Sequence, residues 1–146
     1  MRFEKCKIDE DIPFEKGQFD LPTRATSESA GYDFHSPFNV KIRRGKTVKF
    51  PLLVKAIEMP KDMVLLIVNR SGLSLKYGLT IDNAIGVIDA DYKRCIWIQI
   101  TNHSKKTYYI KANDKIAQGI FVRYNVVSND IVGNVKRNGG FGSTGR

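Results

Sequence analysis

The sequence predicts an all-β fold, either a sandwich or a barrel, with one short helix. Short segments of alternating apolar and polar residues recur along the 146-residue chain, and glycine or proline separates one segment from the next. This pattern is typical of short antiparallel strands joined by turns. Because the chain has the length of one domain and shows no internal repeat or low-complexity linker, we expect residues 1–146 to form a single domain.

The first strands in this pattern lie on either side of a turn. Apolar residues alternate with polar ones over residues 38–43 and again over 48–50, and Arg44 and Gly45 stand between them. We expect these two segments to form a hairpin. Pro51 and Pro60 bound the next segment. Because proline cannot donate a backbone hydrogen bond, we expect this segment to lie at a sheet edge or in a bend.

The later segments predict further strands and the helix. Residues 64–68 form an apolar run that predicts a strand buried on both faces, and the isoleucines of 96–100 form one apolar face of another strand. Residues 108–110 and 116–122 predict two more strands, and residues 71–77 predict the short helix.

The pattern changes at residue 129. From there to residue 146 the chain consists mainly of Asn, Gly, Ser, Thr and basic residues, which cannot bury enough apolar surface to order themselves. We expect 129–146 to be a mobile arm. A frayed terminus without function is the alternative.

Composition indicates an ordinary globular protein. Hydrophobic residues make up 42% and charged residues 27% of the chain, and no apolar run approaches the ~20 residues of a membrane span. The amino-terminal residues mix both charges and lack the apolar stretch of a signal peptide. We therefore expect a cytoplasmic protein with no membrane partner.

The cysteines and histidines suggest no metal site. Cys6 and Cys95 are far apart in sequence and lack metal-ligand spacing, so we expect free thiols in a reducing compartment, with a bridge as the alternative. His35 and His103 are too scattered for a zinc site or a catalytic triad, and we expect both at the surface.

The net charge of +9 indicates an anionic partner. A nucleic acid, an acidic membrane surface and a nucleotide triphosphate all satisfy this charge, and a basic surface without a particular ligand is also compatible with it. Charge alone does not choose among them.

Two segments could carry chemistry. Asn69-Arg70-Ser71-Gly72 stands where a strand ends and the helix begins, which suits an anion site. The alternative is that Ser71 only caps the helix. Asp89 and Asp91 stand at a chain reversal, where a carboxylate could act as a base toward water, or where both could be solvated turn residues.

Five blocks in order resemble the five motifs of the homotrimeric dUTP pyrophosphatases (dUTPases). They are AGYDF at 30–34; RSGL at 70–73 with Lys76 and Gly78; Asn83 with GVIDADY at 86–92; NDKIAQ at 113–118; and GGFGSTG at 139–145. Each block alone is a weak signal, but five in order over residues 30–145 are very hard to obtain by chance.

This resemblance implies a fold, an assembly and an activity. The implied fold is a distorted jelly-roll β-barrel or sandwich with a flexible glycine-rich C-terminal arm. The implied assembly is a homotrimer in which each active site is built by more than one subunit and the arm closes over the nucleotide. The implied activity is hydrolysis of dUTP to dUMP and pyrophosphate, which limits uracil incorporation into DNA and supplies dUMP for dTMP synthesis.

The resemblance also implies roles for single residues. Asp89 resembles the carboxylate that takes a proton from the water attacking the α-phosphorus, and Gln118 matches a residue that holds the phosphates and this water together with Arg70, Ser71 and Gly72. The other implied substrate contacts are Asn83, Val87, Ile88 and Trp97 around the uracil, Tyr92 under the deoxyribose, Phe141 stacked on the uracil, and Gly142, Ser143 and Thr144 on the γ-phosphate. Mg²⁺ is expected to be held through the triphosphate and water rather than by protein ligands.

The chain departs from the family pattern in two places. The usual arginine of the arm falls on Lys136, and Arg137 stands one place later; we assign the phosphate contact to Arg137, since only a guanidinium binds phosphate bidentately. Arg94 stands where the family commonly has a glycine. Asp33, in the first block, is expected to act only indirectly.

Two other functions are compatible with parts of the sequence. The related dCTP deaminases resemble this chain in fold, but their catalytic glutamate falls on Gln99, and an amide cannot transfer the proton that deamination needs. A basic β-barrel that binds nucleic acid is the second alternative, suggested by the charge and by Trp97, Tyr108 and Tyr109 near lysines. With dUTP as substrate, no nucleic acid partner is expected.

Overall fold

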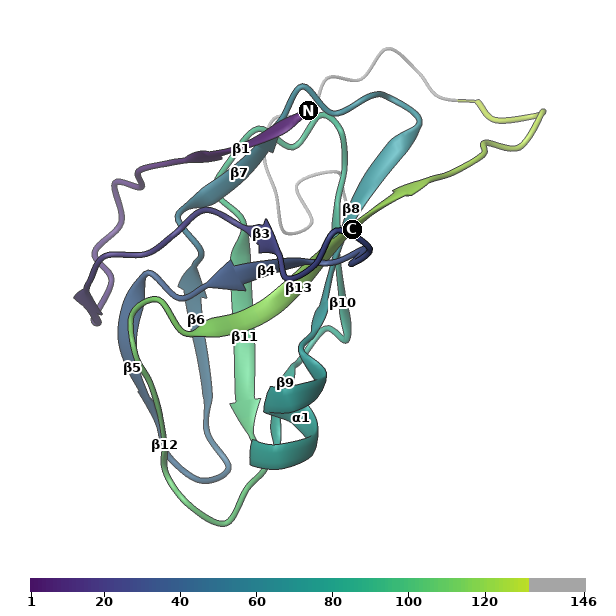
Figure 1. Cartoon of the computed structure of the whole chain (residues 1–146). Helices are drawn as coiled ribbons and strands as arrows, with labels where there is room; N and C mark the ends of the chain where they lie inside the picture. Colours follow the sequence, from purple (N-terminus) through teal and green to yellow (C-terminus); the bar gives the residue numbers. More distant parts are fainter. Residues whose placement is uncertain (132–146) are drawn as a thin grey trace.

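The computed structural model describes residues 1–131, and every structural statement below refers to this part of the chain (Figure 1). It contains thirteen strands and one helix. Their bounds are β1 (Arg2–Lys5), β2 (Glu15–Lys16), β3 (Thr23–Arg24), β4 (Tyr32–His35), β5 (Phe38–Ile42), β6 (Thr47–Pro51), β7 (Val54–Ile57), β8 (Met63–Asn69), α1 (Ser71–Tyr77), β9 (Leu79–Ile81), β10 (Ile85–Ile88), β11 (Trp97–Asn102), β12 (Tyr108–Ile110) and β13 (Lys115–Arg123).

The strands pair antiparallel and form four sheets. The largest has the order β10-β8-β13-β4-β3, and the others are β6-β11-β9, β12-β5-β2 and β1-β7. Each of these sheets has two edge strands, so residues 1–131 form open sheets and no closed barrel. The prediction of an all-β fold with one short helix is confirmed, and helix α1 covers the predicted residues.

One hydrophobic cluster joins the three larger sheets. Phe34 of β4, Ile42 of β5, Phe50 of β6, Leu65 of β8 and Ile100 of β11 are all fully or almost fully buried in it. Each such side chain contributes roughly 1.5–3 kcal/mol by leaving water. The alternation seen in the sequence therefore reflects sheets that each bury one face.

The prediction of a hairpin over residues 38–50 is wrong in its pairing. Strands β5 and β6 both form, and the chain turns at Gly45, which has a φ of 66°, but β5 pairs with β12 and β2 whereas β6 pairs with β11. Asn102 explains the difference. Its buried side-chain Nδ2 donates to the carbonyl oxygen of Ile42 at 2.9 Å, and its backbone carbonyl oxygen accepts from the backbone N–H of Gly45 at 2.8 Å. The end of β11 thus separates the two strands.

Strand β8 is buried on one face only, which also differs from the prediction. Met63, Leu65 and Ile67 are buried, but the alternate side chains remain partly exposed. Those side chains join their neighbours on β10 and β13 in an apolar strip, defined by register as Val64, Leu66, Val68, Ile85, Val87, Ile120 and Val122. Val87 is 60% exposed and Ile85 is 50% exposed, so the strip is a surface of the single chain.

The expectation of free thiols is also wrong. Cys6 and Cys95 form a disulfide, with their Cα atoms 5.9 Å apart and a separation of 89 positions in sequence. Spacing in the sequence carried no sign of this pairing. The fold creates it by placing the end of β1 beside the loop that leads into β11, since the backbone N–H of Cys6 donates to the carbonyl oxygen of Leu53 and that of Ile96 donates to the carbonyl oxygen of Val54.

Candidate active site

At one end of β8, three polar side chains contact the buried carboxylate of Asp33. Asp33 is 2% exposed and accepts hydrogen bonds from Arg70 Nε at 3.1 Å and Gln118 Nε2 at 3.2 Å, both on its Oδ1. Lys115 Nζ lies 2.9 Å from the other oxygen, Oδ2. The structure therefore brings Arg70 and Gln118 together, and Asp33 sets the position of both.

The register of three strands explains this cluster. Gln118 of β13 pairs with Asp33 of β4 on one side and with Val68 of β8 on the other. Arg70 follows the last residue of β8, so its side chain can turn back onto Asp33.

The charges of the cluster favour an ionised Asp33. Burial pushes the pKa of Asp33 up, but hydrogen bonds from Lys115, Gln118 and Arg70 outweigh it and hold the pKa below its usual range. Asp33 is therefore a fixed negative charge at neutral pH that orients the cations around it.

Next to this cluster is a small basic pocket of about 350 Å³. Its lining includes the side chains of Arg70, Lys76 and Lys115 with a single carboxylate, Asp114, and Gly72 at the start of α1. The N-cap residue of α1 is Arg70 and no side chain caps the helix, so the alternative of Ser71 as a helix cap is wrong. The predicted anion site thus lies in a cationic pocket.

Asp89 lies in a different pocket. It follows β10 in a turn closed by the Tyr92 N–H, which donates to its carbonyl oxygen at 3.0 Å. Asp89 is half-buried and Asp91 is exposed. Both line a cavity of about 660 Å³ whose other walls are Met59, Lys61, Ala90, Lys93 and Tyr124. Neither aspartate shares this cavity with Arg70.

The two pockets stand at opposite ends of β8. Ile88 pairs with Leu65, so continuing the register places Asp89 beside Val64, whereas Arg70 follows the far end of the strand. The six steps from position 64 to position 70 span about 20 Å of extended strand. Within one chain, Asp89 cannot act on a phosphate held at Arg70.

The predicted nucleoside contacts divide between β10 and the loop after it. Val87 and Ile88 lie in β10, an edge strand of its sheet that pairs only with β8 within residues 1–131. Asn83 lies in the exposed turn before β10. Its side chain is close to Gly86, because a Cβ atom added to Gly86 would lie 3.6 Å from Asn83 Nδ2. These residues are thus close together in one turn and strand.

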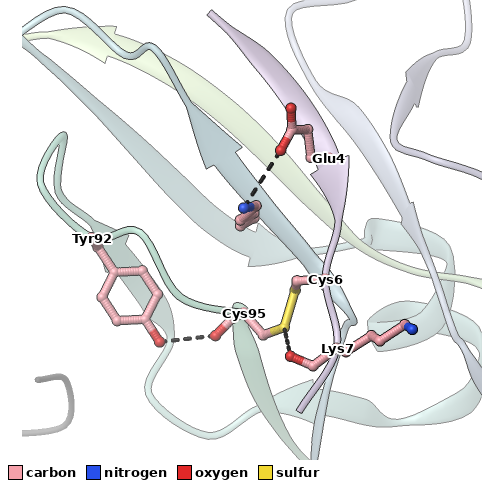
Figure 2. The surroundings of a disulfide bond; sticks show 6 residues. Glu4, Cys6, Lys7, Tyr92 and Cys95 are labelled. Carbon is pink, nitrogen blue, oxygen red and sulfur yellow. Dashed lines mark hydrogen bonds and ion pairs between the residues drawn. A yellow bond between two sulfur atoms is a disulfide. The ribbon is translucent and has the colours of Figure 1, made fainter.

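Tyr92 and Trp97 line a third cavity, beside the disulfide. The Tyr92 hydroxyl donates to the carbonyl oxygen of Cys95 at 2.9 Å (Figure 2). Trp97 begins β11, and Lys49 Nζ lies 5.1 Å from the centre of its ring. Trp97 therefore lies in a different sheet from Val87 and Ile88, because β10 and β11 belong to different sheets.

The residues behind the two alternative functions lie apart. Gln99, at the position of the deaminase glutamate, is exposed and donates to Asp82 Oδ2 at 2.7 Å. Trp97 lies in the sheet of β11, whereas Tyr108 and Tyr109 lie in the sheet of β12, so these aromatics form no single stacking platform.

The remaining predictions concern the arm, a metal site and a membrane span. Arg137, Phe141, Gly142, Ser143 and Thr144 lie outside the described residues. Within residues 1–131 no group of three His, Cys, Asp or Glu side chains could hold a metal ion. No helix in the same range is long and apolar enough to cross a membrane.

Sequence reasoning missed two features of the site. Lys115 was not predicted as a contact of Asp33, although pairing the strands of the first and fourth blocks would have placed them together. His35, expected at the surface, is instead 6% exposed, and burial lowers its pKa. His103 is exposed, as predicted.

These features define an all-β protein with a cationic pocket and a carboxylate pocket at opposite ends of one strand. The family model for dUTPase matches residues 17–145 of the chain. The deoxyuridine 5'-triphosphate nucleotidohydrolases of Haemophilus ducreyi and Pectobacterium carotovorum are 34% and 33% identical to it over 136 residues, or 88% of this chain and 89% of each relative. The chain therefore belongs to the dUTPase family.

Solved structures agree with this assignment. The dUTPase from Streptococcus mutans superposes with a TM-score of 0.73 at 31% identity, covering 87% of this chain and 98% of that one. The dUTPase from phage phi11 of Staphylococcus aureus gives a TM-score of 0.69 at 26% identity, covering 81% and 92%. A mutant of the phi11 enzyme, 25% identical with a TM-score of 0.70, coordinates a structural Mg(II) ion and covers 82% and 93%.

Proposed function

We propose that this chain hydrolyses dUTP to dUMP and pyrophosphate in the cytoplasm, as a homotrimer whose active sites are shared between subunits. The observation that carries the shared site is the separation of Asp89 from Arg70 by the length of β8. Each end of the strand has half of the required chemistry, so a second copy has to supply the other half.

The apolar strip supports this assembly. Val87 and Leu66 lie on the same sheet face as Gln118, because paired residues of neighbouring strands point to the same side. Continuing β10 by one alternation puts Asp89 on this side as well. A copy that covers the strip therefore brings the Asp89 end of one chain toward the Arg70 end of another, in the head-to-tail manner that closes a ring.

The proposed chemistry is attack of a water on the α-phosphorus. Asp89 takes the proton of this water as general base. Gln118 and the start of α1, with Ser71 and Gly72, position the phosphates and the water, and Arg70 binds the phosphate oxygens through its guanidinium. Asp33 holds Arg70 and Gln118 in place for this role.

The nucleoside is proposed to lie along β10. An edge strand offers backbone N–H and C=O groups to which a uracil ring can pair, in the way a further strand would. Asn83, Val87, Ile88 and Trp97 are the proposed contacts of the base, and Tyr92 is the proposed contact of the deoxyribose. From the arm, Arg137, Phe141, Gly142, Ser143 and Thr144 are proposed to close over the nucleotide.

Magnesium fits this site as an ion held by the substrate. Its ligands would be triphosphate oxygens and water, which suits the ion's preference for keeping its hydration. Bound there, it would neutralise charge on the triphosphate and favour attack by water.

The first test is a pyrophosphate-release assay with dUTP, dCTP, dTTP and UTP in the presence of magnesium. We expect efficient turnover of dUTP alone. Comparable turnover of dTTP would contradict the proposed reading of the base, and release of ammonia from dCTP would indicate a deaminase.

The second test mixes two inactive variants, Asp89→Asn and Arg70→Ala. If each site takes its carboxylate and its guanidinium from different chains, unfolding and refolding an equal mixture restores up to about a quarter of the wild-type activity, by random assembly of a ring. Refolding each variant alone is the control. No recovery in a mixture that has formed mixed oligomers would contradict the shared site.

A further inference from the structure

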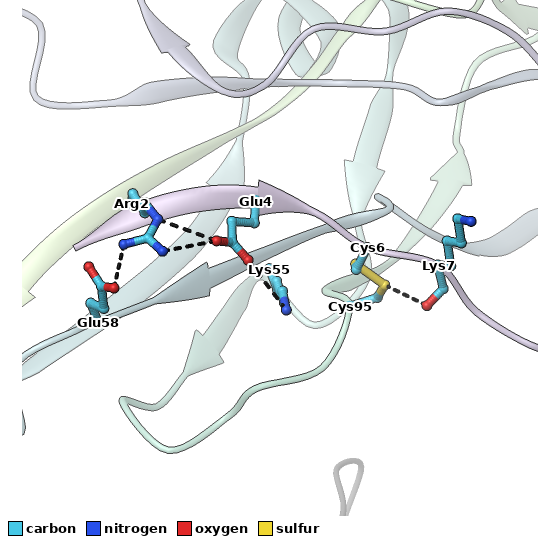
Figure 3. Close-up of polar contacts among 7 residues, drawn as sticks. All are labelled: Arg2, Glu4, Cys6, Lys7, Lys55, Glu58 and Cys95. Atoms are coloured by element: carbon cyan, nitrogen blue, oxygen red, sulfur yellow. Dashed lines mark hydrogen bonds and ion pairs between the residues drawn. A yellow bond between two sulfur atoms is a disulfide. The ribbon is translucent and has the colours of Figure 1, made fainter.

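The Cys6–Cys95 disulfide joins the end of strand β1 to the loop that precedes β11. Cys6 follows β1, which pairs only with β7 among the described strands. Ion pairs of Arg2 with Glu4 and Glu58, and of Glu4 with Lys55, add to this pairing (Figure 3). Cys95 ends the loop that carries Asp89 and Tyr92. The bond therefore fixes the proposed catalytic loop to the amino-terminal strand.

Backbone contacts hold the chain on both sides of this loop. The Ile96 N–H donates to the carbonyl oxygen of Val54 at 2.8 Å, and the Leu52 N–H donates to that of Ile96 at 2.7 Å. At the other end, Ile88 is paired in β10. Opening the disulfide would thus remove one anchor of residues 89–95 and loosen this loop, while Ala90 and Tyr92 still pack against the hydrophobic cluster and the strands on either side remain.

The disulfide lies in a basic cavity of about 700 Å³, which both cysteines line. Six cationic and two anionic side chains share its wall, namely Lys5, Lys7, Lys49, Lys55, Lys93 and Arg94 with Asp9 and Glu10. Cations favour the thiolate form of a cysteine and attract anionic reactants. The surroundings therefore suit exchange with an anionic thiol.

We propose that Cys6–Cys95 is a thiol–disulfide exchange site for small carboxylate-bearing thiols, and that its reduction loosens the loop of residues 89–95. The effect on substrate rests on the proposed function, whereas the exchange itself does not. Cys6 is the point of attack, because it is partly exposed while Cys95 is 5% exposed.

The exchange balances in two steps. The thiolate of the reductant attacks Cys6 Sγ, the bond between the two protein sulfurs breaks, and its electron pair leaves on Cys95 Sγ. Cys95 then takes a proton from water, and the resulting thiol can donate to the carbonyl oxygen of Lys7, 3.6 Å away. A second thiolate attacks the reductant's sulfur in the mixed disulfide, which releases the oxidised reductant and the Cys6 thiolate. Two thiols thus supply the two electrons.

The consequence for the site passes through Tyr92. Its hydroxyl donates to the backbone of Cys95 and its N–H donates to the backbone of Asp89. When Cys95 is released, the substrate has to order this loop on binding, which weakens its affinity. We expect the KM for dUTP to rise about fivefold on reduction.

The exchange is tested on the full chain without any substrate. The oxidised protein is mixed at equal thiolate concentration with glutathione, which is anionic, or with cysteamine, which is cationic, and thiol release is followed by mass spectrometry. Glutathione should react about tenfold faster at low salt, and 1 M salt should remove most of the difference. Lys7→Glu should reduce the preference, whereas Lys105→Glu, an equal change of charge outside the cavity, should keep it.

Loosening of the loop is tested by hydrogen exchange of residues 89–95 in the oxidised and reduced protein and in Cys6→Ser, with circular dichroism to confirm that each remains folded. Reduction and Cys6→Ser should both speed exchange there and raise the KM, and Cys6→Ser should not respond to thiols. Equal glutathione and cysteamine rates, failure to form the disulfide under oxidised glutathione, or equal loop exchange in both forms would each overturn the proposal. Absence of dUTP hydrolysis in either form would instead overturn the proposed function and leave the exchange measurements intact.

Discussion

The Arg70 end and the Asp89 end of β8 differ in how their side chains are held. At the Arg70 end, the buried carboxylate of Asp33 binds two cations and an amide, and the register of three paired strands fixes all of them. At the Asp89 end, an edge strand leads into a turn, and the loop is held by the disulfide at Cys95 and by the packing of Ala90 and Tyr92 against the hydrophobic cluster.

This difference corresponds to what each end is proposed to do. A triphosphate needs cations that are already in place, since donors fixed beforehand need not reorganise during the reaction. A loop that receives the nucleoside has to admit and release a ligand, so a position outside the three paired strands suits it. Rigid and adjustable parts of the site are thus placed at separate ends of one strand.

The largest expected effect is on the chemistry at the adjustable end. Asp89→Asn should lower kcat for dUTP by at least ~100-fold, because an amide cannot accept the proton of the attacking water. The melting temperature should change little, since the carboxylate is half-buried in an open cavity. Asp91→Asn is the matched control from the same cavity, and a loss as large as that of Asp89→Asn would contradict the assignment of the base.

The next effect tests whether the two ends meet between chains. Ile120→Glu places a charge in the apolar strip at a residue that is no proposed substrate contact, so the oligomer should dissociate, and activity should fall at least about tenfold because the half-sites are separated. Analytical ultracentrifugation and the pyrophosphate assay measure the two changes. Val127→Glu, at a residue that is 68% exposed and outside the strip, is the control; an active monomer of Ile120→Glu would contradict shared sites.

Sequence reasoning predicted the parts of this comparison that depend on local pattern. The alternation of β5 and β11, the extent of α1 and the order of the five blocks are all readable from neighbouring residues. The resemblance also named Arg70, Asp89 and Gln118, which the structure divides between the two ends.

Contacts between distant segments could not be predicted in this way. Asn102 separates β5 from β6 through hydrogen bonds to residues 42 and 45, and no local pattern signals such a role. The disulfide depends on β1 lying beside a loop 89 residues away. The same holds for the approach of Lys115 to Asp33, which follows from strand register.

A smaller effect is expected from weakening the rigid end. Asp33→Asn removes the charge that two cations share, and should cost about 2 kcal/mol, or about 5 °C in melting temperature; this is less than for a fully buried pair because Arg70 and Lys115 retain some contact with water. Activity should fall as well, since Arg70 loses its orienting partner. Asp62→Asn is the control, because its ion pair with Arg123 is exposed and should contribute little. Equal stability of the two variants would show that the Arg70 end is not held by Asp33.

The smallest effect concerns the buried histidine beside this cluster. Burial is the main cause that lowers the pKa of His35 from 6.5, so the folded protein resists a proton that the unfolded chain accepts. Stability should therefore be highest above pH 6.5 and should decline as the pH falls below it, until the folded form is protonated too. Thermal melts from pH 8 to pH 5 measure how the melting temperature changes with pH. In His35→Leu this change should be smaller, even if the substitution itself raises or lowers the melting temperature. An unchanged slope in His35→Leu would assign the pH dependence to other groups.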